Sequence, residues 1–248
     1  MTWTLVTIPI SHYCDKARWA LDRAGIAYTE DGHVPMLHYM AARRAKGKRT
    51  VPILLHDHGV AADSTDILHL IDARLPSERK LFPDEPLLRT QVVEWEELFD
   101  RSLGPASRRW AYFHLLSDPK LATEILDVGT PRHEATIVRL AFPVFAGFLR
   151  RGLNITPQKA AQSLEKVQSL FAAVSAHLAD GRRYICGDRF TAADLTFAAL
   201  ASPVLLPEGH PKVKADYKRV PAAMRAEIEA LRATPAGQLA LRLYREER

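Results

Sequence analysis

A short apolar run leads directly into a helical pattern near the start of the chain, and this junction constrains the fold more than any other feature. Residues 3–8 have the composition of a strand. Apolar residues then recur at helical spacing from Ala17 to Ala24, and Gly25 follows where a left-handed residue ends a helix. The polar residues 11–15 therefore lie at a helix N-terminus, whose free N–H groups and positive dipole end favour an anion such as a thiolate.

A second group of elements follows at the spacing of one small α/β domain. Val51-Pro52 stands directly before a strand, where proline is tolerated and its peptide bond can be cis. Two apolar runs, 53–55 and 60–62, are joined by a short connection that contains Gly59, which predicts a hairpin. Asp63-Ser64 then begins another helical pattern. Two helix N-termini, at Ser11 and at Ser64, are thus expected to face one cleft.

This order of elements resembles the thioredoxin-like N-terminal domain of the glutathione S-transferase superfamily. In that family a Ser, Tyr or Cys after the first strand contacts the glutathione sulfur, and the residue before a cis-proline pairs with the peptide backbone. An acidic residue and a Ser bind the γ-glutamyl group. The resemblance assigns these roles to Ser11, to Val51, and to Asp63 with Ser64.

The residues around Ser11 also indicate which branch of the superfamily the chain resembles. The motif Ser11-His12-Tyr13-Cys14, followed by Lys16 and Arg18, looks like the serine-type classes of cytosolic transferases. Considered alone, Ser11 could be an ordinary cap and Cys14 a small buried side chain. The ordered set of motifs favours the functional interpretation.

The second half of the chain differs in pattern from the first. A charged, proline-punctuated connector spans 77–86, and helical patterns follow over 87–116, 131–151 and 157–178. We therefore expect an α/β domain over 1–76, a linker over 77–86, and an all-α helical-bundle domain over 87–248. At 47% hydrophobic residues, the chain can fill the cores of both domains.

The sharpest local signal of the second half is the segment 186–195. Thr191 and Asp194 have the spacing of a capping box, and Phe190 with Leu195 has that of a hydrophobic staple. The segment resembles the capping motif of the transferase C-terminal domain. Its role is structural, and Cys186 within it is expected to be buried and inert.

The second substrate of such an enzyme would bind where the resemblance is weakest. On the first long helix of the second domain, Gly104, Arg108 and Tyr112 follow one another at intervals of four and could line the cleft above Ser11. They could equally be an ordinary helix surface, because nothing local marks them as functional. The identity of the electrophile does not follow from the sequence.

Charge and composition argue against nucleic-acid binding and against a membrane-spanning segment. The net charge is +5, and a basic run spans 43–49. This run can be a solvated loop or the cationic rim of a glutathione site; it lacks the interleaved aromatics of a nucleic-acid site, so no nucleic-acid partner is expected. The apolar stretch 137–149 is too short to span a membrane and contains Pro143, which predicts a buried, kinked helix.

Histidine and cysteine usage bear on metal binding and on the cellular compartment. The ten histidines are scattered without ligand spacing, so no metal is expected. Two cysteines cannot form a disulfide framework, and the first residues lack the charged region of a signal peptide, so we expect a cytoplasmic protein. A homodimer is implied by the family resemblance alone.

The function predicted from these observations is a glutathione transferase that activates the thiol of glutathione for conjugation to a small, hydrophobic electrophile. Glutathione is then a co-substrate. Two alternatives remain at this point. One is a glutathione-dependent thiol transferase or reductase that uses Cys14, provided that Cys14 is exposed and in electropositive surroundings. The other is a transferase-like module that binds ligands without catalysis.

Overall fold

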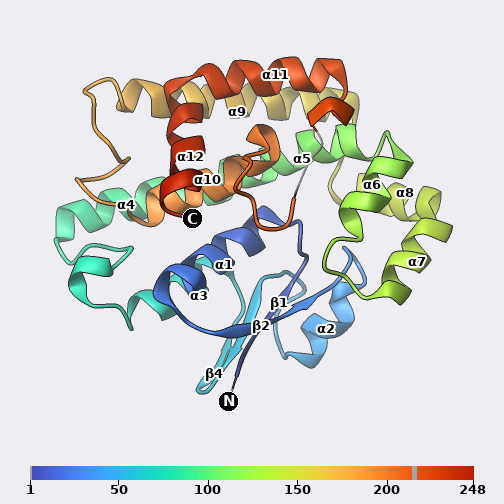
Figure 1. The fold of residues 1–248 in the computed structure, drawn as a ribbon, viewed down its shortest axis with the longest axis horizontal. Helices are drawn as coiled ribbons and strands as arrows, with labels where there is room; N and C mark the ends of the chain where they lie inside the picture. Colours follow the sequence, from blue (N-terminus) through green and yellow to red (C-terminus); the bar gives the residue numbers. More distant parts are fainter. Residues whose placement is uncertain (1, 214–216) are drawn as a thin grey trace.

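The first part of the chain forms a mixed sheet with helices on both faces. The computed structural model describes residues 2–213 and 217–248 (Figure 1). The strands pair in the order β2-β1-β3-β4. In chain order the elements are β1 (Trp3–Thr7), α1 (His12–Ala24), β2 (Tyr28–Gly32), α2 (His38–Arg44), β3 (Ile53–His56), β4 (Gly59–Ala61) and α3 (Ser64–Asp72).

Successive side chains along each strand point to opposite faces of the sheet, and this decides which helix packs on which face. β1 pairs with β2 in parallel, which requires the crossover through α1, and pairs with β3 antiparallel. Leu5 and Leu54 face α1 and α3, whereas their neighbours Val6 and Ile53 pack against α2. Because both faces are covered, α1 is held with its N-terminus at the end of β1.

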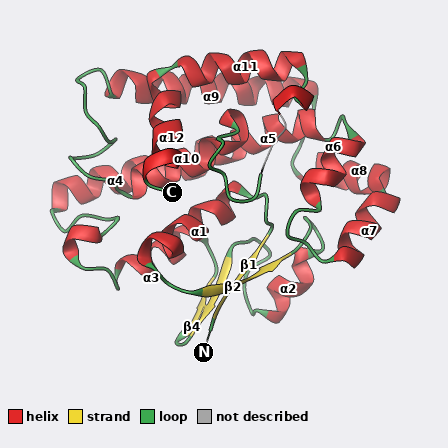
Figure 2. Ribbon diagram, viewed as in Figure 1, coloured by secondary structure: helices red, strands yellow, loops and turns green. Residues whose placement is uncertain are grey.

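The second part of the chain is helical. Figure 2 shows the strands confined to one end of the molecule and the helices stacked beside them. These helices are α4 (Pro86–Leu98), α5 (Gly104–Leu115), α6 (Pro119–Leu126), α7 (Arg132–Leu140), α8 (Phe142–Gly152), α9 (Pro157–His177), α10 (Ala192–Leu205), α11 (Ala222–Ala233) and α12 (Pro235–Glu246). The predicted fold, a small α/β domain followed by an all-α domain, is confirmed.

The helix expected over 87–116 contains an interruption that faces α1. A π-helical turn, Phe99–Leu103, separates α4 from α5. The Tyr13 hydroxyl donates to the Asp100 carbonyl at 2.7 Å, and the Tyr13 ring packs so closely on Gly104 that a Cβ there would lie 2.2 Å from its oxygen. Glycine at this position therefore lets the start of α5 approach the start of α1.

α10 forms the centre of the helical domain, and its N-terminus is closed as the sequence predicts. Nearly all of its side chains are buried. Asp194 accepts hydrogen bonds from the Thr191 backbone N–H at 3.0 Å and from the Thr191 hydroxyl at 2.8 Å. It also accepts from the Ile185 N–H at 2.8 Å. Cys186 is buried, and burial raises the pKa of its thiol to about 12.

The expectation of a buried helix over 137–149 is wrong in one respect. The stretch is broken, as Pro143 predicts, because α7 ends at Leu140 and α8 begins at Phe142. It is only half buried, however, since four large apolar side chains on the two helices are exposed: Ile137, Leu140, Val144 and Phe148. The apolar run is amphipathic across two short helices, a geometry that the run itself does not reveal.

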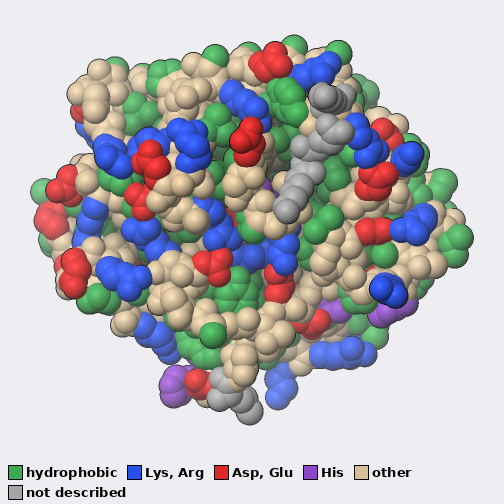
Figure 3. Space-filling view, viewed as in Figure 1, with side chains coloured by type: hydrophobic (Ala, Val, Ile, Leu, Met, Phe, Trp, Pro, Cys, Tyr) green, Lys and Arg blue, Asp and Glu red, His purple; other side chains and the backbone are tan. Residues whose placement is uncertain are grey.

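Surface and metal-binding features of the described residues are unremarkable for such a fold. No helix within residues 2–213 and 217–248 is both long enough and apolar enough to span a bilayer. In the same residues, no group of three or more His, Cys, Asp or Glu is placed to hold a metal ion. On the face drawn in Figure 3, Lys and Arg side chains are intermingled with Asp and Glu.

Candidate active site

Ser11 occupies the N-cap of α1 with its hydroxyl left free of the usual capping role. Its backbone is extended, at φ −73° and ψ 125°, and its side chain makes no capping hydrogen bond. Its carbonyl accepts from the Asp15 N–H at 2.9 Å, which is the first bond of the helix. The open first turn of α1 therefore presents a hydroxyl and unpaired N–H groups to whatever binds there.

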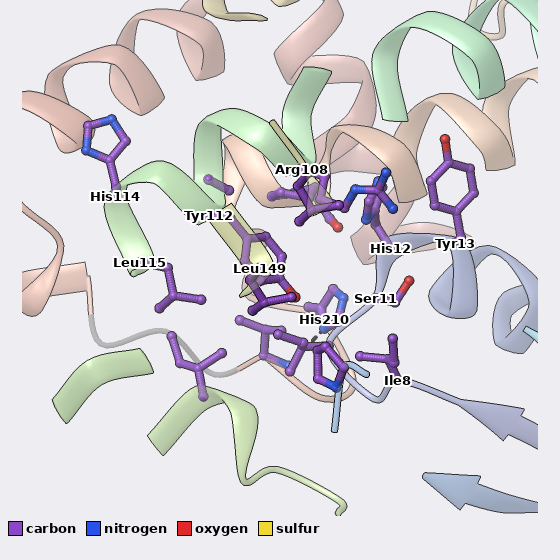
Figure 4. Close-up of a pocket in the computed structure, with 18 of the residues that line it drawn as sticks. Ile8, Ser11, His12, Tyr13, Arg108, Tyr112, His114, Leu115, Leu149 and His210 are labelled. Carbon is purple, nitrogen blue, oxygen red and sulfur yellow. Dashed lines mark hydrogen bonds between the residues drawn. The ribbon is translucent and has the colours of Figure 1, made fainter. Parts of the chain in front are cut away.

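A cavity of about 370 Å³ opens at this helix end (Figure 4). Ser11 and Val51 line it from the α/β domain, and Arg108 and Tyr112 line it from α5. The structure therefore brings these four predicted site residues to one cavity. The remainder of the wall is largely apolar and includes Ile8, Ile10, Leu115, Leu121, Ile125, Leu149, Leu153, Val213, Val220 and Met224.

Another part of the cavity wall is the segment that directly precedes the cis-proline. The Val51–Pro52 peptide bond is cis, and Val51 is half buried on the cavity wall. Arg49 and Thr50 line the same wall, and the Arg49 carbonyl accepts from His38 Nε2 at 3.1 Å. The backbone before the cis-proline and the basic side chain of Arg49 therefore lie on the same wall, which suits an extended anionic peptide.

Asp63 and Ser64 lie at the N-terminus of α3, outside the cavity lining. Asp63 is half buried and accepts from the Thr65 N–H at 2.9 Å, so part of its carboxylate caps α3. Ser64 is only 2% exposed. Lys16 Nζ donates to Thr65 Oγ1 at 3.1 Å, which places the start of α3 next to the start of α1. The two helix N-termini are neighbours, but the expectation that both face one cleft is not met, because Ser11 lines the cavity and Asp63 and Ser64 do not.

The basic residues of the motif are buried in ion pairs and face away from the cavity. Lys16 is fully buried, and its Nζ lies 2.8 Å from Asp100 Oδ1, 3.1 Å from Thr65 Oγ1 and in contact with Glu96. Arg18 pairs with Glu30 at 2.9 Å. Lys16 joins α1 to α3 and α4, so its role is to fix the two helix N-termini relative to each other.

Cys14 is enclosed in the interior directly behind Ser11. It is fully buried, and burial raises the pKa of its thiol to about 11. The Ser11 side chain is its hydrogen-bond neighbour. The condition for the thiol-transfer alternative, an exposed Cys14 in electropositive surroundings, is therefore not met.

His12 is a site residue that the sequence does not reveal. It lines the cavity beside Ser11, and its Nε2 lies 3.0 Å from the Gly104 carbonyl. Burial, with a contribution from Arg108, lowers the pKa of His12 to about 3, so the ring is neutral and its Nε2–H donates. The partner is 92 residues away, so no local pattern could have indicated this tie between α1 and α5.

Comparison with models of protein families identifies the family of this chain. The family model of the glutathione S-transferase N-terminal domain matches residues 5–79, and that of the glutathione S-transferase C-terminal domain matches residues 157–220. Together they cover more than half of the chain. The protein therefore belongs to the glutathione S-transferase superfamily. Among curated proteins, the sequence finds no significant match.

Three solved structures of similar fold, from two bacteria and a fungus, illustrate the likeness. A glutathione S-transferase of Methylobacterium radiotolerans in complex with glutathione sulfonate is 19% identical, with a TM-score of 0.56 over 97% of this chain and 95% of that one. The β-etherase LigF of Sphingobium sp. is 19% identical, with a TM-score of 0.60 over 98% and 99%. Ure2p5 of Phanerochaete chrysosporium, cocrystallized with 1-(S-glutathionyl)-2,4-dinitrobenzene, is 16% identical, with a TM-score of 0.58 over 99% and 95%. At these identities the likeness concerns the fold.

Proposed function

We propose that this protein is a glutathione transferase in which Ser11 activates the bound thiol for attack on a small hydrophobic electrophile. The observation that carries the proposal is the hydroxyl of Ser11, which is unused in capping, stands at an open helix N-terminus and lines a largely apolar cavity. The superfamily membership supports the identity of the thiol as that of glutathione.

The chemistry required of Ser11 is modest and matches its surroundings. An ordinary thiol has a pKa of about 8.5 and is mostly protonated at neutral pH. A hydrogen bond from the Ser11 O–H, together with the N-terminus of α1, favours the thiolate. The thiol proton leaves to solvent, the sulfur forms a bond to the electrophilic carbon, and the leaving group departs with its electron pair.

The remaining glutathione contacts follow from the neighbouring elements. In this proposal the backbone of Val51 pairs with the peptide, and Asp63 and Ser64 bind the γ-glutamyl group at the N-terminus of α3. Arg49, on the cavity wall beside Val51, is suited to the second carboxylate of glutathione. This placement makes part of the basic run 43–49 the rim of the site, one of the two roles that the sequence leaves open.

The second substrate would occupy the apolar part of the cavity against α5. Arg108 and Tyr112 lie on its wall, one helical turn apart. Holding an electrophile next to the sulfur supplies the rest of the acceleration by proximity. We further propose, from the resemblance, that the protein acts as a cytoplasmic homodimer in the detoxification of electrophiles; light scattering on the purified protein tests the dimer.

Calorimetric titration with glutathione, followed by conjugation assays with a panel of electrophiles, tests the function. We expect a dissociation constant between micromolar and millimolar, about −4 to −8 kcal/mol, and a rate above the uncatalysed reaction for at least one electrophile. Absence of a binding signal at tens of millimolar glutathione would refute the proposal. Binding without turnover of any electrophile would favour the non-catalytic module instead.

A further inference from the structure

The described residues that line the cavity include cations and no carboxylate. Neither Asp nor Glu occurs among them, whereas Arg49 and Arg108 do, together with four histidines. Burial lowers the pKa of His12 to about 3 and lowers that of His38, His114 and His210, so these rings are neutral at pH 7. The positive charge of the cavity wall thus resides on its two arginines.

The two arginines belong to different parts of the cavity. Arg49 precedes Val51, on the wall proposed above for the glutathione peptide. Arg108 projects from α5, and Figure 4 shows its guanidinium beside His12, on the α5 side of the Ser11 hydroxyl, with Tyr112 next along the wall. Electrostatic coupling of Arg108 to His12, Tyr13 and Tyr112 agrees with this position. Arg108 therefore stands between the sulfur site and the apolar region.

Arg108 lacks the partners that its neighbour in the sequence has. The Arg109 guanidinium donates to the Leu153 carbonyl at 3.1 Å and to Ser163 Oγ at 3.0 Å. No hydrogen bond or ion pair joins the Arg108 guanidinium to another described residue. A half-buried guanidinium with five N–H donors and no acceptor is a binding site for an anion, with carboxylate as the best geometric match.

Tyr112 adds a second donor on the same wall. It follows Arg108 by one helical turn, and burial raises the pKa of its hydroxyl to about 12, so the proton is retained at neutral pH. Within the part of the chain that the structure describes, no hydrogen bond occupies this hydroxyl. A ligand group that accepts from Arg108 can therefore also accept from Tyr112.

We infer that Arg108 selects second substrates that carry an anionic group, so that the electrophiles of this enzyme are aromatic or otherwise apolar compounds with a carboxylate. This inference rests on the proposed transferase function. The carboxylate is bound and unchanged in the reaction: the glutathione sulfur replaces the leaving group on carbon, and the leaving group takes the electron pair. The Leu and Ile side chains of the same cavity wall are suited to cover the apolar body of the substrate.

A matched pair of acceptors tests the inference. 4-Chloro-3-nitrobenzoate and 4-chloro-3-nitrobenzamide differ in charge and little in size, and each rate is divided by its uncatalysed rate. We expect Arg108→Gln to lower kcat/KM for the benzoate by roughly 10- to 100-fold and for the benzamide by less than about threefold, the scale of lost charge-assisted hydrogen bonds. Arg101→Gln removes the same charge at a side chain that is 77% exposed and outside the cavity, and should change neither rate.

Measuring the equilibrium binding of unreactive ligands tests the role of Arg108 without requiring turnover. With S-methylglutathione present, unreactive 3-nitrobenzoate should bind wild type more tightly than 3-nitrobenzamide does, and Arg108→Gln should remove the difference. If wild type turns over no acceptor while this preference for the benzoate persists, the proposed function fails and the role of Arg108 stands.

Two other results would overturn the inference. Equal losses on both acceptors, with a raised pKa of the bound thiol, would show that Arg108 serves the thiolate. Weaker glutathione binding by Arg108→Gln, with no change in the preference between benzoate and benzamide, would show that Arg108 serves a glutathione carboxylate.

Discussion

The N-termini of α1 and α10 have similar N-cap residues but differ in what those residues contact. Each begins with a hydroxyl residue in extended conformation at the N-cap, Ser11 in one and Thr191 in the other. Thr191 is fully buried and bonded to Asp194, three residues on. Ser11 has Cys14 at that position, makes no capping bond and faces a cavity.

The residue at the third helical position accounts for the difference. A carboxylate there folds back on the N-cap and closes the helix end, as Asp194 does. Cys14 has no carboxylate, and the Ser11 N–H donates instead to the Ile8 carbonyl at 2.8 Å. The helix end at Ser11 therefore stays open for an external anion. A hydroxyl residue at the start of a helix is available to a ligand when neighbouring residues of the chain do not occupy its hydroxyl with a hydrogen bond.

The largest effect on activity is expected at the open N-terminus of α1. Ser11→Ala should lower conjugation by roughly 10- to 1000-fold, because one or two charge-assisted hydrogen bonds to the sulfur are lost, with a smaller effect on glutathione affinity. Steady-state kinetics and calorimetry on the same preparations measure both. Unchanged kcat/KM in a folded Ser11→Ala variant would remove Ser11 from the mechanism.

Removing the acceptor at the closed end should affect folding. Asp194→Ala leaves two backbone N–H groups and the Thr191 hydroxyl without their acceptor in the core. At roughly 1–3 kcal/mol for each unsatisfied buried group, we expect a loss of about 3 kcal/mol or more, measured by urea denaturation. A loss below about 1 kcal/mol would show that the closed end contributes little.

The same carboxyl should make stability depend on pH. Burial raises the pKa of Asp194 from 3.8 to about 6, so the native state holds its proton more tightly than the unfolded state does. The free energy of unfolding of wild type, relative to Asp194→Asn, should therefore fall by about 1–3 kcal/mol as pH rises from about 4 to about 6. A relative stability that rises over this range contradicts the assignment.

A smaller loss is expected from the cap residue itself. Thr191→Ala should destabilise the protein by about 0.5–2 kcal/mol, because the hydroxyl bond to Asp194 is lost while the backbone bond remains. Glutathione affinity should be nearly unchanged. A variant with wild-type stability that no longer binds glutathione would mean that the motif serves the site rather than the fold.

The smallest effect is expected at Cys14. Because the thiol is buried and protonated, Cys14→Ala should leave conjugation within about threefold of wild type. Abolished activity in this variant, with glutathione found attached to Cys14 of the wild type by mass spectrometry, would replace the Ser11 mechanism by thiol transfer.

Local signals predicted the fold well and the cavity only in part. The left-handed Gly25, the hairpin at Gly59 and the capping box at Thr191 are each decided by neighbouring residues, and each is confirmed. The exposed faces of α7 and α8 were missed because an apolar run does not show which of its side chains find partners.

The site residues also divide into those that local sequence signals indicate and those that depend on distant contacts. Ser11 and Val51 stand at element ends that the sequence marks, and Arg108 and Tyr112 share one helical face. The contact of His12 with Gly104, by contrast, depends on how two domains pack. Residues brought together across domains carry no pattern in the sequence.

The pKa of the bound glutathione thiol is the most direct test of the open helix end. Thiolate absorbance in the ultraviolet, titrated with saturating glutathione, gives this pKa for wild type, Ser11→Ala and Thr191→Ala. We expect a value at least about one unit below the free thiol's value of about 8.5 in wild type and Thr191→Ala, and a return toward it in Ser11→Ala. A pKa that is equally low in Ser11→Ala and wild type would contradict the claim that the Ser11 hydroxyl is held open for the thiolate.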